Sequence, residues 1–249
     1  MTDPAERPRP SSQEAEARKA LRALFERRPI PEEAILDHLE VFLRPQRIAE
    51  LLALSEIYHR ILEVHGVVME FGVRWGRHLS VFAGLRGTLE PTNFYRRIIG
   101  FDTFAGFEGI DVADGRSDRV HAGAMSVSAG YEEYLAEVLA LHEQEAPMSH
   151  IRRFELCKGD APVALEAYLE RRPDTIVALA YFDMDLYRPT RECLELLRPH
   201  LTKGSVLAFD EVMHPDFPGE AIAVKEALVL ADVQLRRLSY CPYPSFVVI

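Results

Sequence analysis

The sequence of 249 residues lacks the marks of several protein classes. It has no apolar run near the about 20 residues that a membrane-spanning helix needs, and residues 1–10 contain no apolar signal-peptide core. Its three cysteines, Cys157, Cys193 and Cys241, form no C-x-x-C pair, so we expect free thiols in a reducing cytoplasm. Positive charge is not in excess either. The formal net charge of −10 gives an acidic surface, which disfavours nucleic acids and membranes as partners.

The composition that is present suits a globular protein. Hydrophobic residues make up 48%, enough for a full core, and the length fits one α/β domain with an accessory segment. Residues 1–10 are rich in proline and charge and are expected to be a disordered tail. Helical patterns over 11–65, including helices from Pro31 and from Pro45 to His65, indicate an N-terminal helical extension. This extension could supply the interface of a homo-oligomer. The main domain is then 66–249.

In the main domain, strand patterns alternate with helix patterns. The expected strands are Val67–Phe71, Arg97–Asp102, Arg153–Cys157, Thr175–Asp183, Ser205–Asp210, Gln234–Tyr240 and Ser245–Ile249. Such alternation predicts a mostly parallel seven-stranded sheet with helices on both faces. Only C-P-Y-P separates the last two strands, which predicts an antiparallel C-terminal hairpin. A parallel sheet that ends in an antiparallel hairpin resembles the Rossmann-like α/β fold of class I methyltransferases. In such sheets, ligands bind beyond the carboxyl ends of the strands.

A dinucleotide fingerprint, G-x-G-x-x-G, is missing after the first strand. The motif there is E-x-G-x-x-x-G, with Glu70, Gly72 and Gly76. Fewer glycines suit a ligand with an adenosine end and an amino-acid end but no phosphate. Gly72 allows a tight turn beneath that ligand, and Glu70 offers a carboxylate to its ammonium group. The motif alone also fits a tight β–α turn without a ligand, and together with the acidic residues that end the next two strands it favours S-adenosylmethionine as the cofactor.

The next two strands also end in acidic residues. Asp102 is positioned to accept both ribose hydroxyls, and Asp160 of K-G-D to accept the adenine amine. The remaining candidate cofactor-binding residues lie at the same strand ends: Thr103, Phe104, Gly159 and Asp183. Between the second strand and the next helix, residues 103–128 form a long segment without a clear period, as functional lids often do.

A cluster of carboxylates is expected where the fourth and fifth strands end. These strands finish in F-D-M-D-L-Y and F-D-E, which contain Asp183, Asp185, Asp210 and Glu211. Converging carboxylates repel each other unless a cation lies among them, and a hard divalent ion such as Mg²⁺ or Ca²⁺ prefers oxygen ligands. Strand alternation is expected to point Asp183 and Asp185 to the same side. His214 could be a base, a substrate contact or an ordinary loop histidine.

The chain resembles the macrocin O-methyltransferase family, which methylates sugar hydroxyls of natural products. The resemblance covers about residues 61–249 and rests on E-F-G-V-R-W-G, F-D-T-F-A-G-F, F-D-M-D-L-Y-R-P-T and the D-E pair. Within the family, the chain is most similar to the branch that methylates TDP-rhamnose in calicheamicin biosynthesis. The resemblance implies a sugar or sugar-nucleotide as acceptor.

The resemblance also implies roles for the acidic residues. Asp183, Asp210 and Glu211 would bind the metal, and Asp185 would be the general base, with His214 as the next candidate. Glu211 departs from the family, which usually has aspartate at this position. Three alternatives stay open: a catechol-type metal-dependent O-methyltransferase, a non-catalytic binding module that kept the fold, and a metal-dependent hydrolase.

Overall fold

The computed structural model describes residues 11–249, so the expected tail at 1–10 lies outside the described residues. The chain divides into two compact units, one ending at Glu50 and one spanning Leu51–Ile249. The sequence placed this boundary later, after residue 65. It falls earlier because the second half of helix α2 (Pro45–His59) belongs to the larger unit, where Tyr58 donates a hydrogen bond to Glu90 (2.7 Å).

The smaller unit is helical, as the sequence indicates. Helix α1 (Ser12–Glu26) begins with a capping box formed by Ser11 and Glu14. The helix expected from Pro31 is instead two short 3₁₀ helices, η2 (Glu32–Ala34) and η3 (Leu36–Phe42). A continuous α-helix is interrupted because His38 adopts non-helical backbone angles.

The larger unit is built on one seven-stranded sheet. Its strand order is β3-β2-β1-β4-β5-β7-β6, and all pairs are parallel except β5 with β7 and β6 with β7. The strands are β1 (Val67–Phe71), β2 (Ile98–Asp102), β3 (Phe154–Lys158), β4 (Val177–Phe182), β5 (Leu201–Phe209), β6 (Arg236–Leu238) and β7 (Cys241–Val248). The expected class I methyltransferase fold is therefore confirmed.

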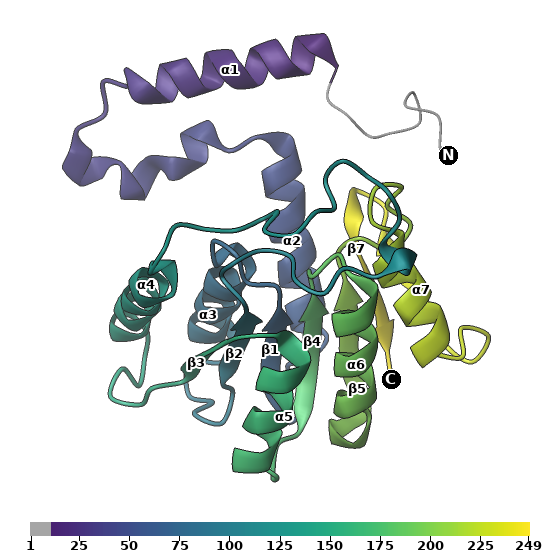
Figure 1. Cartoon of the computed structure of the whole chain (residues 1–249). Helices are drawn as coiled ribbons and strands as arrows, with labels where there is room; N and C mark the ends of the chain where they lie inside the picture. The colour runs from purple at the N-terminus through teal and green to yellow at the C-terminus, as the bar shows by residue number, and fades with distance from the viewer. Residues whose placement is uncertain (1–10) are drawn as a thin grey trace. The chain divides into compact units, whose positions relative to one another are not determined.

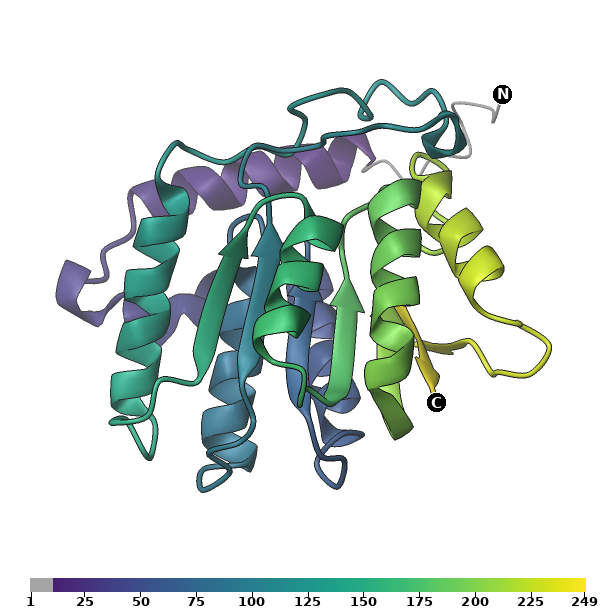
Figure 2. The same ribbon diagram turned by 60° about the horizontal axis from the view of Figure 1, so that its bottom comes forward.

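Helices cover both faces of this sheet (Figures 1 and 2). They are α3 (Arg77–Leu89), α4 (Tyr131–Glu145), α5 (Ala161–Arg171), α6 (Tyr187–Leu197) and α7 (Pro218–Ala227). The unit also has two short 3₁₀ helices, η4 (Val112–Asp114) in the segment after β2 and η5 (Arg198–His200) directly after α6. In Figure 2, α5 and α6 lie in front of the sheet and α3 behind it. No helix between residues 11 and 249 combines the length and apolar character of a bilayer-spanning segment.

The C-terminal hairpin differs from expectation in its turn. Residues 241–244 were expected to connect the strands, but they begin β7, and Leu238 pairs with Cys241. Prolines are tolerated there because β7 pairs with β5 only from Ser245 to Val248, so Pro242 and Pro244 are not required to donate to that ladder.

Candidate active site

A row of stacked phenylalanines aligns the carboxyl ends of four neighbouring strands. The ring of Phe71 lies 4.9 Å from that of Phe101 and 4.9 Å from that of Phe182, whose ring lies 5.2 Å from that of Phe209. All four rings are fully buried. Because these residues are the last or nearly last of their strands, the residues that follow emerge side by side at one edge of the sheet. They are Gly72, Asp102, Asp183 and Asp210.

The turn after β1 requires glycine at position 72. Gly72 has a φ of +92°, and a Cβ there would lie 2.0 Å from the backbone oxygen of Asp183. No side chain fits in that space, because the obstructing atom belongs to the neighbouring strand end. Gly76 also has a positive φ, +76°, but the atoms nearest to a Cβ there belong to the side chain of Leu135 in α4. Gly72 is thus the stricter requirement of the motif.

Asp102 connects two of the turns at this edge. Its carboxylate accepts hydrogen bonds from the backbone N–H groups of Arg74 (2.7 Å) and Phe104. Burial raises the pKa of Asp102, and these backbone donors oppose that rise. Thr103 donates to the Gly106 carbonyl (2.9 Å) and so shapes the turn that follows.

The K-G-D segment after β3 lies at the same edge, since the Gly159 N–H donates to the Asp102 carbonyl (2.9 Å). Gly159 has a φ of +139° and open space around its Cα. Asp160 does not stand alone, because Arg188 of α6 donates to both of its carboxylate oxygens (2.9 and 3.2 Å). The strand ends expected to hold the cofactor are therefore brought together.

Glu70 and Asp183 share a histidine that the sequence did not single out. His78 Nδ1 lies 3.3 Å from a Glu70 oxygen and 3.4 Å from an Asp183 oxygen. Burial, followed by the charges of Asp102 and Asp210, raises the pKa of Glu70 well above its ordinary value. Burial and then the charge of Asp210 do the same for Asp183.

Asp185 lies past the end of β4 and not on it. The expected strand alternation between Asp183 and Asp185 is therefore wrong, because β4 ends at Phe182 and Asp185 adopts a φ of +63°. The residue is nonetheless buried close to the cluster. Burial, followed by the charge of Asp210, raises its pKa to about 7, against the opposing charges of Arg119 and Arg74. A carboxylate with that pKa is suited to exchange protons near neutral pH.

Asp210 and Glu211 are held by two buried groups that the sequence analysis missed. Tyr181, on β4, donates its hydroxyl to Asp210 (2.5 Å). Glu220, in the first turn of α7, accepts the backbone N–H of Glu211 (2.8 Å). Burial, then the charges of Asp185 and Asp210, raises the pKa of Glu211 to about 9. The only sequence signal for Tyr181 was its position two residues before Asp183.

His214 is placed beside this cluster with one ring nitrogen already engaged. Its Nδ1 accepts the backbone N–H of Asp216 (3.1 Å) and lies 3.8 Å from a Glu211 oxygen. Accepting at Nδ1 leaves the proton of the neutral ring on Nε2. Burial lowers the pKa of His214, which favours that neutral form. The ring is therefore arranged to donate a hydrogen bond through Nε2.

The long segment after β2 is anchored across the site. Phe107 and Ala124 of this segment pack against Leu186 and Phe217, which follow β4 and β5. The guanidinium of Arg119 lies 4.8 Å from the centre of the Phe217 ring, and Asp114 accepts the Tyr187 N–H (2.6 Å). The segment thus bridges the two acidic strand ends, as a lid over them would.

The donor set suits a hard cation in its chemistry, although the side chains are not closed into a metal shell. Within residues 11–249, no group of three or more His, Cys, Asp or Glu side chains is arranged to hold a metal ion. Yet the charges of Asp210, Asp185 and Glu211 all raise the pKa of Asp183, and Glu211 has a buried oxygen without a hydrogen-bond partner. Oxygen donors that repel one another in this way fit Mg²⁺ or Ca²⁺.

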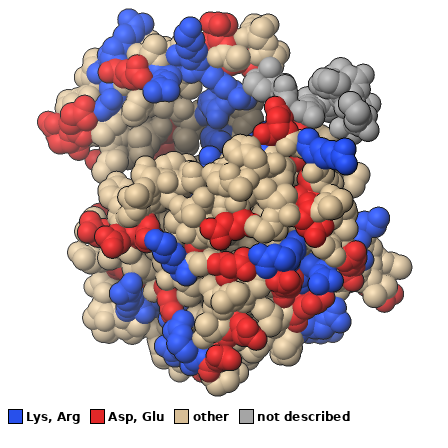
Figure 3. Space-filling model, in the orientation of Figure 1, with Lys and Arg blue, Asp and Glu red and all other residues tan. Residues whose placement is uncertain are grey.

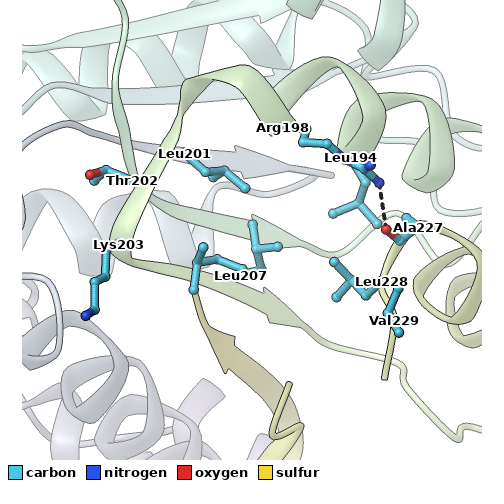
Figure 4. A pocket seen from close by; sticks show the side chains of 10 residues that line it. Leu194, Arg198, Leu201, Thr202, Lys203, Leu207, Ala227, Leu228 and Val229 are labelled. Carbon is cyan, nitrogen blue, oxygen red and sulfur yellow. Dashed lines mark hydrogen bonds between the residues drawn. The ribbon is translucent and has the colours of Figure 1, made fainter. Parts of the chain in front are cut away.

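An apolar cavity of the larger unit lies away from this site. A cavity of about 440 Å³ has a mainly aliphatic lining from the start of β5 and from α6 and α7, including Leu194, Leu201 and Leu228 (Figure 4). It lies toward the opposite edge of the sheet. On the face in Figure 3, acidic and basic side chains of the larger unit are intermixed and form no single-sign patch.

Comparison with known proteins identifies close structural relatives. No protein-family model matches the chain, and no curated protein matches it. A crystal structure of the calicheamicin methyltransferase CalS11 is 43% identical, with 100% of this chain and 97% of that chain covered and a TM-score of 0.96. An apo structure of CalS11, a TDP-rhamnose 3′-O-methyltransferase, is 42% identical over 99% of each chain, with a TM-score of 0.88. The O-methyltransferase NovP, 18% identical over 81% of this chain and 79% of its own, shares the fold with a TM-score of 0.59.

Proposed function

Because the chain belongs to the macrocin-type family of S-adenosylmethionine-dependent sugar O-methyltransferases, we propose that it methylates a hydroxyl of a TDP-linked deoxysugar in natural-product biosynthesis. The chain is an S-adenosylmethionine-dependent O-methyltransferase, so the alternatives of a non-catalytic module and a hydrolase are set aside. The observation that carries the sugar assignment is the 42% identity, over 99% of each chain, to a TDP-rhamnose 3′-O-methyltransferase.

We assign the donor to the edge formed by β1, β2 and β3. Gly72 lets the turn after β1 pack directly against the Asp183 backbone, and the buried Glu70 carboxylate, two residues before that turn, would meet the ammonium group. Asp102 would reach the ribose, and Asp160 with its partner Arg188 would border the adenine. Thr103, Phe104, Gly76 and Gly159 would shape the two turns around the nucleoside.

The metal assignment rests on the acidic residues after β4 and β5. Asp183 and Asp210 would hold Mg²⁺ or Ca²⁺, with Glu211 as the third ligand. When bound, such a cation lowers the pKa of a coordinated hydroxyl and neutralises the cluster. The support for this assignment is the pKa of Asp183, which burial and then the charges of Asp210, Asp185, Glu70 and Glu211 raise well above its ordinary value.

The chain's own residues then remove the proton of the acceptor hydroxyl and align the acceptor with the donor methyl group. Asp185, with a pKa of about 7, takes the proton of the sugar hydroxyl as that oxygen bonds to the donor methyl carbon and the methyl–sulfur bond breaks. His214 donates through Nε2 to the acceptor and serves as a contact rather than as the base. The segment 103–128 excludes water from the reacting groups, and alignment contributes at most about 7–11 kcal/mol.

Mass spectrometry tests the proposal directly. The purified protein is incubated with S-adenosylmethionine, Mg²⁺ or Ca²⁺ and a panel of TDP-deoxysugars, with catechols as the control acceptors. We expect one methyl group to be added to a TDP-sugar and none to a catechol. Methylation of catechols alone would show that the catechol-type alternative is the correct function.

We also propose that the protein is a homo-oligomer. The support is the exposure of large apolar side chains in the smaller unit, among them Leu36 (77%) and Val41 (68%). Light scattering coupled to gel filtration measures the assembly state. A monomer at micromolar concentration would contradict this part of the proposal.

A further inference from the structure

Three aromatic side chains, which we call the aromatic cluster, gather beside the donor turn and have no role in the mechanism above. They are Trp75 of the turn and Tyr131 and Tyr134 of α4. The rings of Trp75 and Tyr131 meet edge to face with centres 4.7 Å apart, and the rings of Tyr131 and Tyr134 are 5.6 Å apart. Trp75 is 46% exposed and Tyr134 is 59% exposed. Part of this aromatic surface is therefore open to solvent at the ligand-binding edge.

The position of the cluster is fixed by contacts to three strand ends. The Tyr131 hydroxyl donates to the Trp75 carbonyl (3.2 Å), which ties α4 to the turn after β1. Arg74, next to Trp75, donates its N–H to Asp102 at the end of β2. Lys158, the last residue of β3, forms an ion pair with Glu132 beside Tyr131. The cluster thus adjoins the edge where the nucleoside part of the donor is assigned.

The chemistry around the cluster favours a flat, uncharged ring as its ligand. Glu132 and Glu133 follow Tyr131 in the first turn of α4, and their charges disfavour a phosphate there. Aromatic side chains bind nucleobases by stacking, because every base presents a π-face. Exposed tryptophan and tyrosine also lose little conformational freedom when they are covered.

We propose that the aromatic cluster stacks the base of a nucleoside bound at this edge, an inference that rests on the proposed function. Two reactants of that function carry a base: the donor has an adenine and a TDP-sugar has a thymine. Trp75 follows Arg74, whose N–H donates to Asp102, and Asp102 is assigned to the donor ribose. The adenine attached to that ribose is therefore expected nearer to the cluster than the thymine. Both bases share the stacking chemistry, and separate titrations distinguish them.

Trp75 is the single tryptophan of the chain, so its fluorescence reports on the cluster alone. The full-length protein is titrated with S-adenosylhomocysteine, and separately with TDP, at fixed Mg²⁺. Saturable change in emission with S-adenosylhomocysteine alone assigns the adenine, and change with TDP alone assigns the thymine. Unchanged emission with both ligands overturns the inference.

Calorimetry of variants provides a second measurement. Trp75→Ala should weaken binding of the stacked ligand roughly tenfold, and Trp75→Phe should restore most of it. Tyr95→Ala is the matched control, because Tyr95 is an exposed aromatic (67%) paired with Phe94 just before β2. Equal affinities of wild type and Trp75→Ala for both ligands would overturn the inference.

The two failures can be told apart. If wild type binds S-adenosylhomocysteine and methylates a TDP-sugar while the emission of Trp75 does not change, only the stacking inference is wrong. If calorimetry shows that wild type binds neither ligand, both the proposed function and the stacking inference are wrong.

Discussion

At the residue scale, Asp185 combines burial with an unusual backbone. It is 8% exposed and has a φ of +63°, a region that residues other than glycine seldom adopt. Such strain persists where the surrounding structure enforces it, and it occurs often at functional sites. Here it turns the carboxylate off the line of β4 and toward Asp210, whose charge contributes to its raised pKa.

Replacing Asp185 should remove the base while leaving the ligands in place. We expect Asp185→Asn to lower kcat by about 10²–10⁴-fold with little change in affinity for S-adenosylhomocysteine. In wild type, the base must be deprotonated, so the rate should rise with pH to a plateau, with an inflection at or below about 7. The pH–rate profile checks this. Asp174→Asn, an exposed matched change, should behave as wild type, and an unaltered kcat in Asp185→Asn would assign the proton to another group.

Gly72 makes a second residue-scale prediction. Gly72→Ala should abolish binding of S-adenosylhomocysteine, because the added Cβ would lie 2.0 Å from the Asp183 backbone oxygen and force both turns apart. The control is Gly84→Ala in α3, where an added Cβ meets nothing within 4 Å. Isothermal titration calorimetry measures both. Retained affinity in Gly72→Ala would show that the donor does not use this turn.

At the element scale, the segment between β2 and α4 depends on a small apolar cluster of its own. Phe107 meets Phe217 edge to face at 6.3 Å, and Leu186 and Ala124 complete the contact. Because these residues follow β2, β4 and β5, the cluster couples the lid to both acidic strand ends. Its stability is local, since it is separate from the main core.

Removing Phe107 should therefore loosen the segment without unfolding the sheet. We expect Phe107→Ala to make the chain sensitive to trypsin at the exposed Arg116 and Arg119 and to reduce kcat at least tenfold. Limited proteolysis followed by mass spectrometry locates the cuts. Phe94→Ala, at a 43% exposed site, should resist trypsin as wild type does. Equal cleavage rates in Phe107→Ala and wild type would show that this cluster does not anchor the lid.

At the scale of the whole molecule, the carboxylate cluster makes stability depend on pH. Asp185 and Glu211 have pKa values raised to about 7 and about 9, above the roughly 4 expected in the unfolded chain. The unfolded state therefore releases these protons first as pH rises. By linkage, the cluster destabilises the metal-free fold progressively between about pH 4 and pH 9.

Calorimetry tests this with and without metal. In chelator, the Tm of wild type should fall relative to that of Glu211→Gln as pH rises from about 5 to about 9. Adding Mg²⁺ or Ca²⁺ should raise the wild-type Tm most at high pH, because a cation binds the ionised cluster. If Tm depends on pH in the same way in both proteins, or if metal leaves the Tm unchanged, the assignment of a cation to this site is contradicted.

The sequence by itself determined the order of strands and helices and the acidic ends of the strands. Apolar runs that end in phenylalanine followed by aspartate or glycine can be read locally, since burial and turn formation act within a few residues. The same local information failed at η2 and η3 and at the final hairpin turn, where contacts between distant segments select among similar local conformations.

Only the tertiary structure decided which groups surround the carboxylates. Tyr181, His78 and Glu220 come from a strand and two helices, and their proximity follows from the sheet order and the row of phenylalanines. The turn of Asp185 off its strand likewise depends on residues far away in the chain. The physical reason is that pKa shifts and backbone strain arise from burial among non-local neighbours, which no spacing along the sequence records.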